Sequence, residues 1–180
     1  MDFKEIYDAH GPFVWRSLRR LGVQEADLPD AAQEVFLVVF RKLPEFEGRA
    51  KITTWLFRIS LRVASDRRKK AHLRREVLDD RIQEQQTSSA DPSAASERLD
   101  DLALFDLALE SMELKHRAVF TLFELEGERC EDIAQILEIP LGTVYSRLRT
   151  AREAFRKAVH RISDTRQARP QVRLASGGRK

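Results

Sequence analysis

The chain has 180 residues, 42% of them hydrophobic and 34% charged, and a formal net charge of +3. This length allows one domain or two small ones, and the composition describes a solvated surface without a membrane-inserting segment. The first ten residues lack the basic start and apolar run of a secretory signal, so we expect a cytoplasmic protein. The single cysteine, Cys130, excludes an internal disulfide and a CxxC metal site.

Charge is segregated along the chain. Residues 1–75 carry 16 Lys/Arg and 10 Asp/Glu, residues 76–113 carry 2 and 11, and residues 114–180 carry 14 and 8. Two basic segments therefore flank an acidic one. This arrangement indicates polyanion contact at both ends of the chain and a different partner for the middle.

Two amphipathic helices are predicted before residue 45. In the first helix, apolar residues recur every three or four positions, at Phe3, Ile6, Tyr7, His10, Val14, Leu18 and Leu21. Gly22 follows as a natural stop. The second helix is expected over 28–43, and Pro44 ends it by removing a backbone donor. It is predicted to bury one stripe, formed by Ala32, Val35, Phe36, Val39, Phe40 and Leu43.

A third helix is expected to begin at Thr53 or Thr54, because either side chain can cap free backbone N–H groups. The helix runs into the basic stretch 67–70. Trp55 lies near its start beside apolar residues, which favours a place in the core. No window of the sequence shows sustained strand alternation, so the predicted fold class is all-α.

Residues 76–98 have linker composition, being polar and rich in Gln, Ser and Ala. Helical periodicity resumes at Leu99. We therefore predict two small helical domains, 1–75 and 99–162, joined by a flexible acidic linker. The tail 163–180 has no periodic apolar face and is expected to be disordered.

Residues 129–156 carry the sharpest local signal in the sequence. Ile133, Ala134 and Leu137 form the inner face of one short helix, and a break at EIPLG follows. The inner face of a second helix consists of Val144, Leu148, Ala151 and Phe155. This pattern is typical of a helix-turn-helix unit, whose second helix enters the major groove of DNA.

The outward side of that second helix is expected to contact DNA. Tyr145, Ser146 and Arg149 point away from the buried stripe near the helix start, where base edges are read. Thr143 can cap the helix or contact phosphate. Candidate phosphate ligands surround these positions, namely Arg147, Arg152, Arg156 and Lys157. The alternative is a plain helical hairpin with an Arg-rich solvated face.

These motifs resemble those of a known family. The stretch FELEGERCEDIAQILEIPLGTVYSRLRTAREAF is similar to region 4 of bacterial sigma factors, DAAQEVFLVVFRKL to region 2.2, and ITTWLFRISLRVASDRRKK to regions 2.3 and 2.4. Their order and spacing resemble the small extracytoplasmic-function group over residues 3–75 and 99–160. The chain departs from the family pattern at Glu138, where the turn often has Gly. Further departures are Tyr145, Thr150 and Arg62, where basic residues or Asn are usual.

The resemblance implies a sigma factor that binds core RNA polymerase and promoter DNA, without a cofactor or enzymatic activity. It also implies a stress or envelope response under the control of an anti-sigma factor. It places the polymerase-binding site on the face of the second helix opposite the core stripe, at Asp30, Gln33, Glu34, Leu37 and Arg41.

Opening of the minus-ten element requires cations beside flat surfaces that hold unstacked bases. In the resemblance, the third helix and the loop before it supply these cations, namely Arg49, Lys51, Arg58, Arg62, Arg67 and Arg68. Ser65 and Asp66 are expected to bond an extruded base. The acidic linker either threads through the polymerase's RNA exit channel or serves as a solubilising tether.

Two other classes of function compete with this interpretation. A stand-alone helix-turn-helix regulator needs an acidic receiver pocket or a ligand cavity in the N-terminal half, and the sequence offers neither. An enzyme acting on nucleic acid needs clustered carboxylates or a nucleophile with its base. The four histidines are instead scattered, at His10, His72, His116 and His160.

Overall fold

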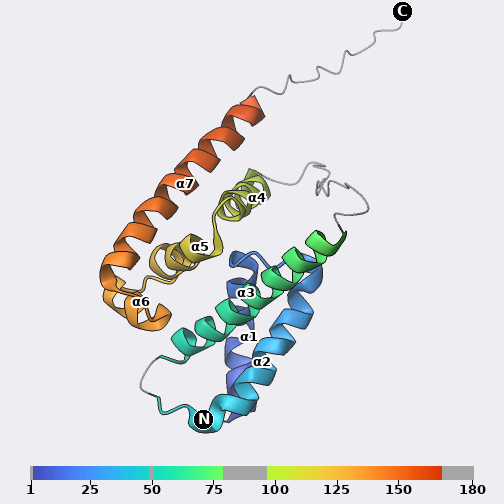
Figure 1. Ribbon diagram of the computed structural model, residues 1–180, viewed down its shortest axis with the longest axis vertical. Coiled ribbons are helices and arrows are strands. Elements are labelled where there is room, and N and C mark those ends of the chain that lie inside the picture. Colours follow the sequence, from blue (N-terminus) through green and yellow to red (C-terminus); the bar gives the residue numbers. More distant parts are fainter. Residues whose placement is uncertain (1, 49–50, 79–96, 168–180) are drawn as a thin grey trace, which may run out of the picture.

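The structure is a computed structural model that describes residues 2–48, 51–78 and 97–167. Side chains are described for 2–48, 51–71 and 104–164. Every regular element in the described ranges is helical (Figure 1), which confirms the predicted all-α class.

Three α-helices form the N-terminal half. They are α1 (Phe3–Arg20), α2 (Leu28–Lys42) and α3 (Ile52–Leu78), with short 3-10 turns at Glu25–Asp27 and Leu43–Glu45. A capping box starts α1, in which the backbone N–H of Asp2 donates to the Glu5 carboxylate over 2.8 Å. The bundle encloses one apolar core, formed by Ile6, Val14, Leu18, Leu28, Ala31, Val35, Phe36, Val39, Leu56, Ile59 and Val63.

Three predictions for this half are wrong. Phe40 and Tyr7 were expected in the buried stripes but are 63% and 52% exposed. Val35 and Val39 take the positions that face the core, which turns Phe40 to the edge of the stripe. Neither Thr53 nor Thr54 caps α3, because the helix begins at Ile52 and both threonines lie within its first turn.

Four α-helices and a π-turn form the C-terminal half. They are α4 (Glu97–Glu110), α5 (Leu114–Phe120), the turn Thr121–Leu125, α6 (Cys130–Leu137) and α7 (Leu141–Gln167). Residues 163–167 continue α7, so the disorder expected from residue 163 is wrong for these five. Residues 79–96 and 168–180, which hold most of the expected linker and tail, lie outside the described residues.

The two halves share a buried cluster, which the sequence did not predict. Leu21, Phe57 and Ala64 from the N-terminal half belong to the same cluster as residues of α5 to α7, namely Ala118, Val119, Leu122, Cys130, Ile133, Ile136, Val144 and Leu148. Phe57 is completely buried. Helix α3 thus carries two apolar stripes, and α6 lies beside the second of them (Figure 1).

Candidate nucleic-acid and polymerase interfaces

The outer face of α2 is exposed as predicted. Leu37 is 50% exposed, although it is a large apolar side chain. Asp30, Gln33 and Arg41 are also exposed. Glu34 is half-buried because Arg67 of α3 donates from Nε to its Oε2 over 3.1 Å. The expected polymerase-binding and minus-ten surfaces therefore meet at this ion pair.

Most of the expected minus-ten residues follow the solvent side of α3. Arg62, Asp66 and Arg68 are exposed, and Ser65 is half-buried. Arg49 lies outside the described residues. The stretch offers repeated positive charge along one helix, which suits a nucleic-acid backbone.

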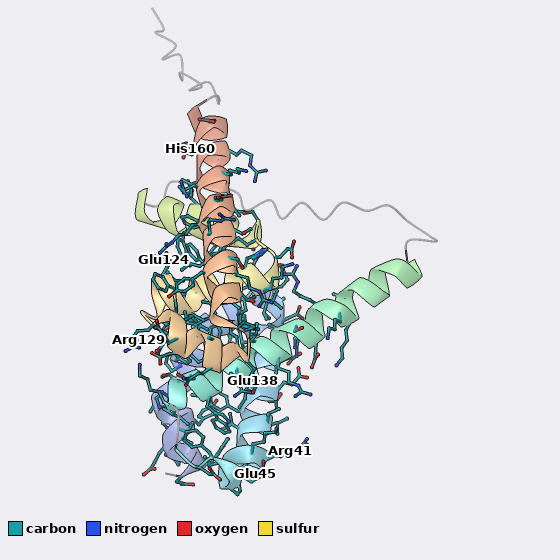
Figure 2. The ribbon with its side chains drawn as sticks, turned by 60° about the vertical axis from the view of Figure 1, so that its left-hand side comes forward. Arg41, Glu45, Glu124, Arg129, Glu138 and His160 are labelled. Atoms are coloured by element: carbon teal, nitrogen blue, oxygen red, sulfur yellow. The ribbon has the colours of Figure 1, made fainter. Side chains whose placement is uncertain are left out.

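The two remaining cations of this set have partners in the other half of the chain. Lys51 Nζ lies 3.1 Å from Glu128 Oε1, and Arg58 forms an ion pair with Glu138. Figure 2 shows Glu138 beside the α3 ribbon. These contacts were not expected, since each joins residues about 80 positions apart in the sequence.

A cavity of about 280 Å³ lies between α3 and α6, lined by Lys51, Thr54, Trp55, Arg58, Glu128, Asp132, Gln135 and Ile136. Trp55 is half-buried at its wall and packs on Phe46, with ring centroids 4.8 Å apart. This packing supports the expected place of Trp55 in the core, against which it is partly buried.

The turn of the helix-turn-helix unit is a Schellman motif. The backbone N–H of Ile139 donates to the carbonyl of Ala134 over 3.0 Å, and that of Glu138 donates to Gln135 over 3.3 Å. Glu138 has φ 54° and ψ 46°, the left-handed region. Glycine adopts this conformation freely, whereas a residue with a Cβ is strained there. The motif turns the chain sharply from α6 into α7.

The start of α7 has the predicted division between buried and exposed side chains. Val144, Leu148 and Ala151 are buried, whereas Tyr145, Ser146 and Arg149 are exposed. The Ser146 hydroxyl donates back to the carbonyl of Thr143 over 3.0 Å. Thr143 itself does not cap the helix, because α7 begins two residues earlier at Leu141.

The expected phosphate ligands of α7 differ in their surroundings. Arg152 donates from Nε to the Glu124 carboxylate over 2.6 Å, and its guanidinium lies 5.1 Å from the centre of the Phe123 ring. Arg147 is half-buried. Arg152, Arg156 and Lys157 are all exposed, but the ion pair with Glu124 already occupies the Arg152 guanidinium. Arg156 and Lys157 are therefore better placed to reach phosphate.

Sequence reasoning missed a buried arginine between the halves. Arg117 is only 3% exposed, its Nε has no hydrogen-bond partner, and its Nη2 donates weakly to the Met112 carbonyl over 3.5 Å. A Cβ on Gly22, which has φ +88°, would lie 2.0 Å from Arg117 Nη1, so Gly22 makes room for the guanidinium. Burial lowers the pKa of Arg117 to about 10, and repulsion from Arg68 adds to this.

Two further ion pairs join the halves. Arg19 Nη2 lies 2.6 Å from Asp106 Oδ2, and Arg20 Nη1 lies 2.5 Å from Glu126 Oε1. Of these contacts between the halves, only the shared core has a signal in the sequence. Phe57, Leu61 and Ala64 recur at helical spacing on α3 and mark a second apolar stripe. Charge patterning gave no signal for the ion pairs.

No group of three or more His, Cys, Asp or Glu residues suited to a metal ion occurs in the part of the chain that the structure describes. Among the described helices, none combines the length and the apolarity that a bilayer span needs. Burial raises the pKa of the Cys130 thiol, which disfavours the reactive thiolate.

Comparison with known proteins adds two family matches. A model described as "Sigma-70 region 2" matches residues 6–74, and one described as "Sigma-70, region 4" matches residues 102–155. The ECF RNA polymerase sigma-E factor of Escherichia coli is 33% identical over 143 residues, which is 74% of this chain and 74% of that protein. The Haemophilus influenzae sigma-E factor is 31% identical over 150 residues, 76% of this chain and 77% of the relative.

Two solved structures share the fold. One is the sigma factor RpoE of Bartonella quintana in complex with the anti-sigma factor NepR. It has a TM-score of 0.68 at 22% identity, and the match covers 88% of this chain and 97% of the RpoE chain. The other is CnrH in complex with the cytosolic domain of CnrY. It has a TM-score of 0.60 at 21% identity, and the match covers 91% of this chain and 88% of the matched chain.

Proposed function

Because the chain belongs to the extracytoplasmic-function sigma factors, we propose that it binds core RNA polymerase and directs transcription initiation at particular promoters. The observation that carries this proposal is the order of two matched regions on one chain, a region 2 helix bundle before a region 4 helix-turn-helix. A stand-alone regulator would need only the second region. We assign region 2 to residues 1–75 and region 4 to residues from 99 onward, with α7 extending the second domain to Gln167.

The exposed face of α2 is the proposed docking surface for the polymerase. Leu37 supports this assignment, because an apolar side chain that stays half exposed among Gln33, Arg41 and Asp30 contributes little to the fold. Such residues become energetically important when a partner buries them. Glu34 sits at the rim of this surface, held by Arg67.

Binding to core polymerase in the absence of DNA tests this assignment. Leu37→Asp is expected to weaken core binding about tenfold or more, which corresponds to roughly 1.4 kcal/mol. Leu107→Asp is the matched control, since Leu107 is a leucine of α4 that is 51% exposed. Equal binding by the two variants, each with unchanged helicity, would contradict the assignment.

The solvent side of α3 is proposed to hold the melted minus-ten strand. Arg62 and Arg68 supply positive charge for the backbone, and Ser65 and Asp66 supply hydrogen-bonding groups for an extruded base. The proposal includes Lys51 and Arg58, once the carboxylates that now pair with them have moved away.

The start of α7 is proposed to read the minus-thirty-five element. Tyr145, Ser146 and Arg149 lie together on the exposed side of a recognition helix whose other side is buried. Arg149 is suited to guanine, whose two major-groove acceptors fit a bidentate guanidinium. Tyr145 is suited to stacking or to a thymine methyl.

We also propose that an anti-sigma factor controls this chain, in the cytoplasm and in a stress or envelope response, and that the chain performs no catalysis of its own. Its likeness to a sigma factor bound to NepR and to CnrH bound to CnrY supports the anti-sigma partner. In vitro transcription with core polymerase on genomic fragments tests the whole function. Reproducible start sites that need this chain are expected, and their absence would refute the proposal.

A further inference from the structure

Two basic residues near the start of α3 form ion pairs with carboxylates of the C-terminal half. These are the ion pairs Lys51–Glu128 and Arg58–Glu138, which we call the α3 clasp. The clasp borders the shared core around Phe57, so charge and apolar burial hold the same two surfaces together. DNA phosphates and the carboxylates of the clasp therefore compete for the same two cations.

Glu138 is an unexpected residue for its position. The Schellman turn requires a left-handed backbone there, and glycine would satisfy that requirement without strain. The turn therefore explains the φ of 54° but not the glutamate. The contact that the glutamate adds is the ion pair with Arg58 across the two halves. This pair offsets part of the cost of the strained backbone.

Closure affects the two DNA surfaces unequally. On the α3 surface, Lys51 and Arg58 are paired with the carboxylates of Glu128 and Glu138. Residues of α6 line one side of the cavity beside this surface. The recognition surface of α7 is open, because Tyr145, Ser146 and Arg149 are exposed in the same arrangement.

We propose that the α3 clasp closes the free chain into an autoinhibited form, which blocks the minus-ten surface but leaves the minus-thirty-five surface able to bind duplex DNA. The inference rests on the proposed function, because it takes α3 as the minus-ten surface. Separation of the two halves is then a step that precedes capture of the melted strand.

The ion pairs of the clasp contribute only part of the closure. The side chains of Arg58 and Glu138 are 46% and 70% exposed, and Lys51 is 71% exposed, although its partner Glu128 is only 11% exposed. Because water reaches at least one group of each pair, each pair shifts the equilibrium by only about threefold. The guanidinium of Arg117 also opposes closure, since it is buried at the shared interface without a carboxylate hydrogen-bonded to it. Opening also exposes Phe57 and its apolar neighbours in the shared core, so polymerase binding must supply the free energy that releases α3.

The test removes the clasp without disturbing the fold. Glu138→Gly relieves the strained turn and deletes one carboxylate, and Glu128→Gln is isosteric. In the double variant we expect the ratio of open to closed chain to rise about tenfold, since two pairs contribute about threefold each. Energy transfer between dyes on cysteines introduced at Ala9 and Lys157, in a Cys130→Ala background, measures this ratio on the full chain without DNA or polymerase.

Binding measurements on the unlabelled free chain, which keeps Lys157, complete the test. The double variant should bind a single-stranded minus-ten oligonucleotide up to about tenfold more tightly, because the competent form is more populated. Its affinity for a minus-thirty-five duplex should stay within about twofold of the parent's. The control is Glu131→Gln with Glu153→Gln, which changes net charge equally at exposed carboxylates of α6 and α7 outside the clasp.

An unchanged dye distance in the double variant, or an equal change in the control, would overturn the clasp. Arg58→Ala in the open double variant tests the premise separately, because it should lower affinity for the minus-ten oligonucleotide. If that affinity stays the same while the dye distance responds to Glu138→Gly, the assignment of Arg58 to DNA is wrong. The proposed autoinhibition then fails with it, although the contact between the halves is real.

Discussion

Replacing Arg117 by methionine is expected to stabilise the chain, although it removes a charged side chain from the centre of the molecule. The guanidinium is 3% exposed and leaves its Nε without a hydrogen-bond partner. Its hydrogen bond to the Met112 carbonyl is 3.5 Å long. Methionine fills a similar volume with apolar atoms and has no charge to desolvate.

The magnitude follows from the pKa of Arg117, which burial lowers to about 10. This lies ~2.5 pH units below an ordinary arginine, and at about 1.4 kcal/mol per unit the buried charge costs roughly 3 kcal/mol. The group is protonated in both folded and unfolded chains below pH 10, so this cost is constant around neutral pH and declines only above pH 10. After allowance for the lost hydrogen bond, Arg117→Met should raise the free energy of unfolding by about 1–3 kcal/mol.

Urea denaturation followed by far-UV circular dichroism measures this change, and thermal melting should shift upward by roughly 2–4 °C for each kcal/mol. Arg129→Met is the matched control. The Arg129 side chain is 74% exposed, so its replacement should change stability by less than about 0.5 kcal/mol. A fall in stability for Arg117→Met, or an equal gain in the control, would refute the reasoning and show that the guanidinium contributes favourably to the interface.

Other substitutions test the core and the two DNA surfaces. Phe57→Ala should lower the free energy of unfolding by about 3–5 kcal/mol in urea titrations. Phe40→Ala should lower it far less, because Phe40 is exposed. Similar losses for the two variants would contradict the shared core. Arg149→Ala should alter the preferred sequence in binding to a randomised upstream element, whereas Arg156→Ala should weaken all sequences evenly and lower the salt slope by about one. Lower affinity with an unchanged preference would place Arg149 among the phosphate ligands. Arg62→Ala should reduce open-complex formation more on duplex promoters than on pre-melted templates, and equal losses would mean that Arg62 only anchors DNA.

Features that depend on local periodicity could be predicted from the sequence. Val144, Leu148 and Ala151 recur at helical spacing, so the buried side of α7 and the outward direction of Tyr145 and Arg149 follow from the sequence alone. The turn between α6 and α7 is equally local. The all-α class and the family resemblance rest on the same kind of short-range pattern.

Features that depend on a partner distant in the sequence could not be predicted. Phe40 has the spacing of a core residue, yet Val35 and Val39 face the core and Phe40 lies at the edge of the stripe, beside the ring of Phe3. The spacing of Phe57, Leu61 and Ala64 marks a second stripe on α3, but it does not say which element covers the stripe.

The ion pairs between the halves show the limit most clearly. Arg58 and Glu138 each look like an ordinary exposed charge in the sequence, and a charged side chain at the surface has many possible partners. Only the docking of α6 against α3 brings these two together. Helical periodicity therefore determined which surfaces of this chain are apolar and which are charged, whereas tertiary packing decided which surfaces meet, because contacts over 80 residues depend on the relative placement of whole helices.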